Sequence, residues 1–131
     1  MSGTVPKIDL QAQEQAGGHT IARHVGKDAL WLSNRLGSDP SISVASSFTD
    51  LRSAEAHVTA AVQANLTALQ QWIASGASAV RQFDYDAGTK VGYGVVRGVA
   101  GVTSMTSLRV IIRRMSGPPY DCFVLTAFPI V

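Results

Sequence analysis

The stretch SLRVIIRRMSGPPYDCFVLTAF, residues 107–128, decides which kind of fold this chain adopts. Two runs rich in β-branched and aromatic residues flank Ser-Gly-Pro-Pro, a typical turn sequence, so the stretch predicts a β-hairpin. Side chains alternate between the two faces of a strand. By that rule the second run has one face made of Cys122, Val124, Thr126 and Phe128 and another made of Phe123, Leu125 and Ala127.

Strand patterns extend from this hairpin back toward residue 77. The run AVRQFDYD (79–86) alternates, and KVGYGVV (90–96) is β-like but interrupted by glycines. Each run is followed by a typical turn sequence, AGT and RGVAG respectively. The second half of the chain is therefore expected to form an antiparallel sheet.

Before residue 77 the apolar residues recur at helical spacing. A short helix is predicted within residues 9–18, with Asp9 as its cap and the Gly-Gly pair as its end. A second helix is predicted within residues 26–37.

A third, longer helix is predicted up to Gly76, with Ser47 or Thr49 as its cap. The preceding segment SDPSISVASS, residues 38–47, is typical of a loop. The expected fold class is α+β, with N-terminal helices packed on a C-terminal antiparallel sheet.

Length and composition indicate one globular domain that spans residues 1–131, since 46% of the residues are hydrophobic and 15% are charged. Residues 1–8 are expected to be a disordered or linker-derived leader. No apolar run approaches the roughly 18 residues of a membrane-spanning helix, and residues 1–10 do not resemble a signal peptide. A single cysteine, Cys122, excludes an internal disulfide framework.

The charge distribution is uneven, although the net charge is only +2. Residues 80–115 hold two aspartates, Asp84 and Asp86, and six basic side chains: Arg81, Lys90, Arg97, Arg109, Arg113 and Arg114. This surplus suits a polyanionic partner such as nucleic acid, although an ordinary solvated face explains it equally well.

Two of the three histidines, His19 and His24, lie close together in GGHTIARHVGKDALWLSNRL, residues 17–36. Either could transfer protons, and either could simply cap a helix, pack or face solvent. Their five-residue spacing does not put two metal ligands on one helix face, and no third ligand is evident. We therefore expect neither a metal nor a cofactor. His57 lies off the best apolar stripe of the long helix and is interpreted as a surface residue.

Other catalytic classes lack support in the sequence. There is no G-x-S-x-G motif, and Cys122 lies in the middle of a predicted strand. Histidine, arginine and hydroxyl groups remain, and these suit phosphodiester transfer in RNA, because RNA carries its own nucleophile in the 2′-hydroxyl. The residues alone are therefore compatible with a ribonuclease but do not identify one.

Three segments in order carry a resemblance: residues 17–36, ASSFTDLRSAEAHV (45–58) and FVLTAFP (123–129). Together they resemble the bacterial RNase A-like toxin domain found at the C-termini of CdiA contact-dependent growth inhibition proteins and other polymorphic toxins. The resemblance extends from about residue 14 to residue 129. It implies an RNase A-like fold without disulfides, which agrees with the single cysteine.

The resemblance also implies the site residues. His24 matches the family's histidine, Arg35 its arginine eleven residues later, and Thr126 the threonine of a Thr-x-Tyr on the last strand. Phe128 stands where the family has tyrosine, which leaves it a role in stacking a nucleobase or shaping the site. His24 is expected to be the general base, Arg35 and Thr126 to stabilise developing charge, and His19 to be the best candidate for the unassigned general acid.

This assignment makes a geometric demand. On one continuous helix, residues eleven apart lie ~16 Å apart along the axis, which is too far to grip one phosphate. A bend between His24 and Arg35 is therefore predicted, with Gly26 as its place. The site is expected in a cleft between the N-terminal helices and the last hairpin.

The resemblance implies a metal-independent RNA endonuclease that acts as an interbacterial toxin and leaves a 2′,3′-cyclic phosphate. The alternative is a non-catalytic RNA-binding or protein-interaction module on the same fold. The expected partners are RNA and a cognate immunity protein, and the domain is otherwise expected to be a monomer. Such a domain is expected to be secreted as the C-terminal part of a larger protein and delivered to the target-cell cytoplasm.

Overall fold

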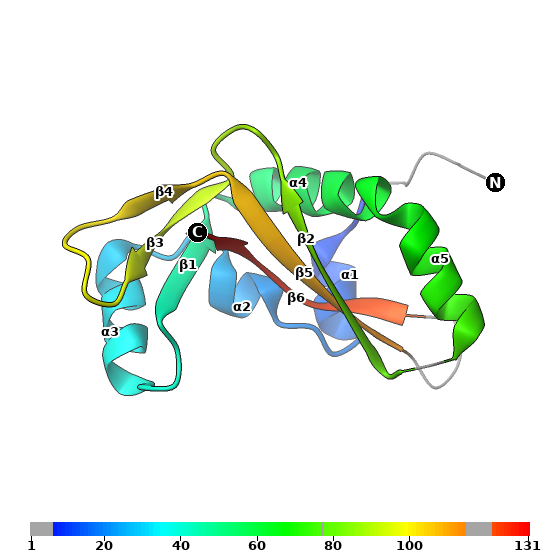
Figure 1. Cartoon of the computed structure of the whole chain (residues 1–131). Helices are drawn as coiled ribbons and strands as arrows, with labels where there is room; N and C mark the ends of the chain where they lie inside the picture. Colours follow the sequence, from blue (N-terminus) through cyan, green and yellow to red (C-terminus); the bar gives the residue numbers. More distant parts are fainter. Residues whose placement is uncertain (1–6, 77, 115–121) are drawn as a thin grey trace.

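The computed structural model describes residues 7–76, 78–114 and 122–131 of the chain. Helices dominate the first part and strands the second, as Figure 1 shows. The helices are α1 (Leu10–Gln15), α2 (Thr20–His24), α3 (Ala29–Ser38), α4 (Leu51–Ala64) and α5 (Leu66–Ser75). The strands are β1 (Val44–Phe48), β2 (Val80–Asp86), β3 (Gly92–Val96), β4 (Thr103–Met105), β5 (Ser107–Arg114) and β6 (Cys122–Ile130). The α+β fold class predicted from the sequence is confirmed.

Within the described residues, the strands form two antiparallel sheets of three strands each, ordered β1-β3-β4 and β2-β5-β6. The predicted hairpin is confirmed, because β5 and β6 pair along their lengths. Its turn sequence lies outside the described residues. The single expected sheet is thus two sheets, which meet where β1 contacts β6.

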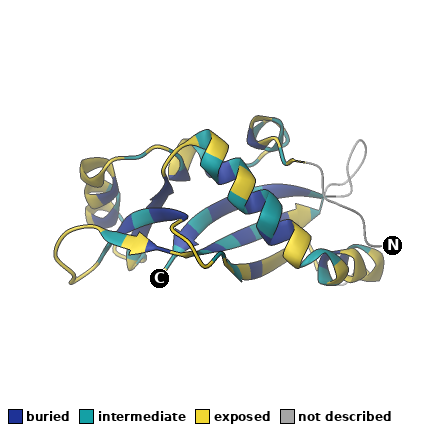
Figure 2. Ribbon diagram, turned by 90° about the horizontal axis from the view of Figure 1, so that it is seen from above, coloured by how far each residue is buried: buried dark blue, intermediate teal, exposed yellow. Residues whose placement is uncertain are grey.

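The main core lies between α4 and one face of the sheet β2-β5-β6. Buried side chains of α4, Ala54, Val58 and Ala61 among them, pack with buried residues of β5 such as Leu108 and Val110. Figure 2 shows buried positions in the strands that this helix crosses. Because α4 covers one face, only the other face of this sheet can line a site.

The prediction of a loop over residues 38–47 was wrong at its C-terminal end, since β1 begins at Val44. Ser46 and Ser47 made the segment polar, but both are buried in the strand. Their hydroxyls are satisfied within the fold: Ser46 Oγ donates to the Pro129 oxygen at 2.6 Å and Ser47 Oγ to the Phe48 oxygen at 2.8 Å. Buried polar side chains need such partners, and the partner of Ser46 comes from a residue distant in the chain.

The predicted helix limits are partly confirmed. Asp9 caps α1 by accepting from the main-chain nitrogens of Gln11 and Ala12. The long helix is capped by Asp50, rather than by Ser47 or Thr49, and it is divided at Asn65 into α4 and α5 before it ends at Gly76. An additional short helix, α2, ends at His24.

The alternation predicted for the last strand fails at a β-bulge. Ile111 pairs with Thr126 but Ile112 pairs with Val124, so Leu125 is an extra residue in β6. As a result Val124 faces the core, and the face that holds Thr126 and Phe128 continues with Phe123 instead. The prediction that Thr126 and Phe128 share a face survives, because both follow the bulge.

The outer edge of β6 is covered by the N-terminal segment. The His19 nitrogen donates to the Leu125 oxygen at 2.8 Å, and the Val124 nitrogen donates to Gln13 Oε1 at 2.9 Å. Gly18 permits this close approach, since a Cβ there would collide with the Val124 oxygen. The edge of the sheet therefore positions α2, and with it His24.

Residues 1–6 of the expected leader lie outside the described residues, but the next two contact α4. The Ile8 nitrogen donates to Thr59 Oγ1 at 2.9 Å, and Lys7 lies 3.5 Å from the Glu55 carboxylate. Within the described parts of the chain, the helices are all too short or too polar to cross a membrane.

A candidate active-site cleft

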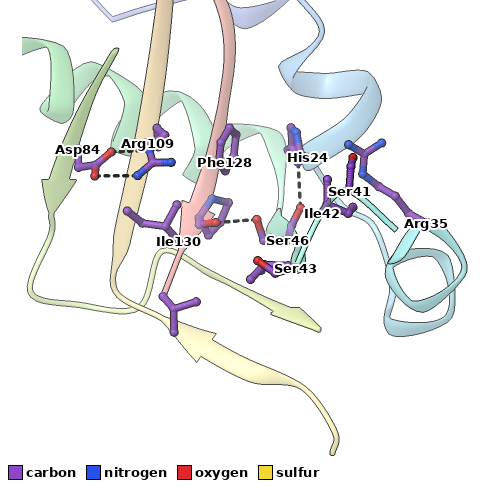
Figure 3. Close-up of a pocket in the computed structure, with 13 residues that line it drawn as sticks. His24, Arg35, Ser41, Ile42, Ser43, Ser46, Asp84, Arg109, Phe128 and Ile130 are labelled. Atoms are coloured by element: carbon purple, nitrogen blue, oxygen red, sulfur yellow. Dashed lines mark hydrogen bonds and ion pairs between the residues drawn. The ribbon is translucent and has the colours of Figure 1, made fainter. Parts of the chain in front are cut away.

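A cleft of about 560 Å³ opens on the sheet face opposite α4. Its walls come from α2, α3, β1 and the segment before it on one side, and from β2, β5 and β6 on the other (Figure 3). The lining residues are His24, Arg35, Ser41, Ile42, Ser43, Val44, Ser46, Asp84, Arg109, Phe128, Pro129, Ile130 and Val131. The cleft thus brings together His24, Arg35 and Phe128 of the five residues predicted from the sequence.

His24 is the last residue of α2 and is 8% exposed. Its Nδ1 lies 3.0 Å from the main-chain oxygen of Ser46 in β1. A carbonyl oxygen only accepts, so the neutral ring donates through Nδ1–H, which leaves Nε2 as the unprotonated nitrogen. The hydrogen bond therefore selects the tautomer in which Nε2 can take up a proton.

Burial lowers the pKa of His24 to about 4, because the charged ring loses its water shell. The hydrogen bond to Ser46 acts in the opposite direction, while the positive charges of Arg35, His19 and Arg23 lower the pKa further. His24 is consequently neutral at physiological pH in the free protein.

The predicted bend between His24 and Arg35 is confirmed. Gly26 has a φ of +66°, a conformation that favours glycine, and its nitrogen donates to the Phe48 oxygen at 3.0 Å. The next nitrogen, of Lys27, donates to Ser47 Oγ at 3.0 Å. The chain is thereby attached to β1 between α2 and α3, so that Arg35 returns to the same cleft as His24.

Arg35 lies half-buried on α3 and lines the cleft. Its Nε is buried, and among the described residues this atom has no hydrogen-bond partner. An unpaired buried donor costs about 1–3 kcal/mol unless a ligand or water satisfies it. The guanidinium is therefore available to an anion in the cleft.

Arg97, in the loop after β3, holds the C-terminal end of α3. Its Nη2 donates to the main-chain oxygens of Leu36 at 2.8 Å, Asp39 at 3.2 Å and Ile42 at 2.9 Å. The Arg97 nitrogen also donates to the Ser43 oxygen at 2.8 Å. One guanidinium thus fixes the segment that lines the cleft beside Arg35.

Phe128 belongs to a row of three side chains across the sheet. Its partner in β5 is Arg109, and the partner of Arg109 in β2 is Asp84. Arg109 donates from Nε and Nη2 to the two carboxylate oxygens of Asp84, at 2.8 and 3.1 Å. On the other side, the Phe128 ring contacts the His24 ring at a centroid distance of 5.1 Å and an angle of 39°. Figure 3 shows Asp84, Arg109, Phe128 and His24 in this order.

Comparison with known families identifies the chain. Residues 18–129 match the model of the bacterial CdiA-CT RNase A domain. The chain belongs to this family. The resemblance seen in the sequence is therefore confirmed.

A solved structure agrees with this CdiA-CT assignment. The chain is similar to one in the crystal structure of a CdiA-CT/CdiI complex from Y. kristensenii 33638, with 34% identity and a TM-score of 0.78. The match covers 87% of this chain and all of the other. No curated protein matches the chain.

Thr126 of this CdiA-CT domain is close to the cleft but does not line it. It lies on the same sheet face as Phe128 and is 6% exposed. Its Oγ1 is buried, with no hydrogen-bond partner among the described residues. The structure therefore leaves this hydroxyl unsatisfied beside the cleft, rather than at its surface.

His19 precedes α2 and is not a lining residue of the cleft. Its side chain makes no capping bond to the helix. Burial and the charge of Arg23 lower the pKa of His19, while Glu14 raises it. The charge of His19 in turn lowers the pKa of His24, so the two rings interact electrostatically.

His57 lies half-buried on α4, where burial lowers its pKa. The sequence pattern predicted a surface residue, whereas the side chain is half-buried, and His57 is not among the lining residues of the cleft. In the described ranges, no group of three or more histidine, cysteine or acidic side chains is placed to hold a metal ion.

Sequence reasoning did not identify Asp84, Arg109 and Ser46 as site residues of this CdiA-CT domain. Ser46 acts through its main-chain oxygen, which every residue possesses. Asp84 and Arg109 are charged residues within strands, and their position in the cleft depends on the pairing of β2, β5 and β6. In the sequence, these two residues were distinguished only as charged residues within the predicted strands.

Proposed function

We propose that this CdiA-CT RNase A domain is a metal-independent RNA endonuclease that acts as an interbacterial toxin. The observation that carries the proposal is the 3.0 Å bond from His24 to the Ser46 oxygen in a cleft shared with Arg35. It leaves a neutral imidazole with an unprotonated Nε2 in the same cleft as a guanidinium, and cleavage through the 2′-hydroxyl uses such a base and such a charge-stabilising donor.

His24 is the general base. Its Nε2 takes the proton of the 2′-hydroxyl while O2′ forms a bond to phosphorus, and the bond from phosphorus to O5′ breaks. The products are a 2′,3′-cyclic phosphate and a 5′-hydroxyl. Arrival of the phosphate anion raises the basicity of His24, since an opposite charge favours the protonated ring.

Arg35 and Thr126 stabilise the charge that develops on the phosphorane oxygens. Arg35 offers a planar set of donors suited to phosphate. Thr126 offers a hydroxyl that has no partner within the described chain and is in the sheet row next to Phe128. We therefore propose that bound RNA supplies the acceptor that this hydroxyl lacks.

The group that protonates O5′ is not assigned by these contacts. His19 stays the best candidate, because it is the N-cap residue of α2, the short helix that ends at His24. Its lowered pKa disfavours the protonated form that an acid requires, so the incoming phosphate must raise it. Phe128 has no hydroxyl to contribute and instead offers its ring to a nucleobase.

The proposed function also implies a partner protein and a route of synthesis and delivery like those of the family. The similar solved chain is named as a complex with CdiI. We therefore expect a cognate immunity protein that masks the cleft, synthesis of this domain as the C-terminal part of a larger secreted protein, and delivery to the cytoplasm of a target cell. The expected extent of the toxin domain is the whole of residues 1–131, apart from the N-terminal leader.

The test is incubation of the pure domain with total RNA and with single-stranded DNA in excess chelator, followed by analysis of the ends. RNA alone should be cut, with cyclic phosphate ends. His24→Ala should slow cleavage by about 10²–10⁴-fold if it removes the base. His57→Ala is the matched control and should cut like the parent. RNA binding without any cleavage would instead support the non-catalytic module, and activity that requires added metal would overturn the mechanism.

A further inference from the structure

Asp84 and Arg109 have no part in the proposed function described above, yet they lie in the same cleft and in one row with Phe128. The three residues are direct cross-strand partners on one sheet face. Neighbouring strands are about 5 Å apart, so the Arg109 main chain lies about 5 Å from that of Phe128. Phe128 in turn contacts the His24 ring. Arg109 is thus within reach of a nucleotide whose phosphate lies at His24.

Charge distinguishes Arg109 from Arg35. Arg35 forms no ion pair with any described residue, whereas Arg109 forms a two-bond ion pair with Asp84. The hydrogen bond that Arg109 donates to Asp84 raises the pKa of Arg109, and the two opposite charges cancel at a distance. A cancelled charge attracts a phosphate weakly. What remains is a set of N–H donors whose direction is fixed.

The free donors of Arg109 have a defined geometry. A guanidinium has five N–H donors in one plane. Asp84 occupies Nε and one proton of Nη2, which leaves Nη1 and the second proton of Nη2 side by side at the end of the group. Two parallel donors match two neighbouring acceptors in one plane. Figure 3 shows Asp84 on the side of Arg109 away from Phe128.

Nucleobases differ in whether they present such a pair of acceptors. Guanine offers O6 and N7, a preferred partner of arginine, and cytosine offers O2 and N3. Adenine and uracil alternate acceptors with donors along their edges. A base that stacks on Phe128 would place its edge toward Arg109, because the two residues are partners in adjacent strands.

We propose that the Asp84–Arg109 pair is the nucleobase-recognition element of this cleft and selects guanine, and secondarily cytosine, next to the cleaved phosphate. Phe128 supplies the stacking surface and Asp84 fixes the orientation of Arg109. This inference rests on the proposed function, because only a nuclease turns recognition of a base into a preference for cleavage next to that base. Binding of the base itself does not depend on cleavage.

The pair is well suited to mutation. Arg109 and Asp84 side chains are 35% and 48% exposed, and an exposed ion pair contributes little to stability. Arg113 is a matched control, since it lies on the same strand and face as Arg109, is exposed, and is not a lining residue of the cleft.

The experiment titrates the intact domain with the four 3′-nucleoside monophosphates by calorimetry. These ligands share ribose and phosphate, differ only in the base and contain no bond to cut. The parent should bind 3′-GMP on the order of tenfold more tightly than 3′-AMP and 3′-UMP, with 3′-CMP between them. Arg109→Gln should abolish the preference, and Arg113→Gln should retain it. Asp84→Asn should reduce the preference while strengthening binding of all four ligands at low salt.

Each contrary result overturns the inference. No preference in the parent, no binding of 3′-GMP at millimolar concentration, or a preference that survives Arg109→Gln removes the recognition element. Equal weakening of all four ligands by Arg109→Gln makes Arg109 a phosphate contact instead. Cleavage of total RNA by the parent is measured in parallel. Its absence refutes the nuclease and leaves the binding result to be judged alone.

Discussion

The Nδ1 atom of His24 lies 3.0 Å from the main-chain oxygen of Ser46, and this contact joins the end of α2 to the middle of β1. It fixes the tautomer of the ring, while burial lowers its pKa to about 4. The proton chemistry of the cleft therefore depends on β1, a strand in a segment for which the sequence pattern predicted a loop.

Stability should depend on pH through His24. Its pKa is 6.5 when unfolded and about 4 when folded, so the unfolded chain binds more protons between these values. Stability should be complete above about pH 6.5 and fall by up to ~3 kcal/mol as the pH drops toward 4. Urea unfolding across this range measures the effect. His24→Gln should remove most of the slope, and an unchanged slope would contradict the low pKa.

Thr126→Val should separate stability from activity. The hydroxyl of Thr126 has no partner among the described residues, so replacing it by a methyl group should leave the free energy of unfolding unchanged or raise it by about 1 kcal/mol. Cleavage should nevertheless slow, because the proposed donor is lost. Thr20→Val is the matched control, since Thr20 Oγ1 is also buried without a described partner, but Thr20 begins α2 and is not on the sheet face that carries Phe128. A Thr126→Val enzyme of parental rate would exclude the hydroxyl from the chemistry.

The pH profile of kcat/KM should reveal the role of His19. A base and an acid give a bell-shaped profile, and loss of the acid flattens its alkaline limb. His19→Ala should therefore flatten that limb, with Phe128→Tyr and the parent measured beside it. If His19→Ala keeps the full bell while Phe128→Tyr raises the rate severalfold, His19 is not the acid and a hydroxyl at position 128 matters.

Arg97→Ala should loosen the wall that carries Arg35. Three main-chain oxygens, of Leu36, Asp39 and Ile42, lose their donor, at a cost of roughly 1–3 kcal/mol. Hydrogen exchange should accelerate in residues 39–43 before it changes in the sheet β2-β5-β6. Arg52→Ala, on the exposed side of α4, is the control for loss of a positive charge. Equal exchange in both variants would show that Arg97 does not hold the segment.

An acidic immunity protein should bind over the cleft and block cleavage. Its association rate should fall as salt rises, because opposite potentials steer the encounter and salt screens them. Stopped-flow association at several salt concentrations and an RNA cleavage assay of the complex measure both effects. Tight binding that leaves RNA cleavage intact would place the partner on another face.

Local features were predictable from the sequence. Asp9 caps a helix by contacts to Gln11 and Ala12, and Gly26 makes a bend that glycine favours, so both follow from nearby residues. The hairpin of β5 and β6 follows from two apolar runs that lie on either side of one turn sequence. The resemblance added His24 and Arg35, which the fold brings to one cleft.

What the tertiary structure decided depends on residues far apart in the chain. Ser46 is in a strand because β1 pairs with β3 and because the Ser46 hydroxyl donates a hydrogen bond to the Pro129 oxygen. The bulge at Leu125, which sets the face of Val124, sits where the His19 nitrogen binds β6. Strand propensity and alternation describe one segment at a time, whereas register, bulges and the row Asp84–Arg109–Phe128 arise only when strands pair. Sequence alone thus determined the α+β class and the local bends, and long-range pairing decided which side chains meet in the cleft.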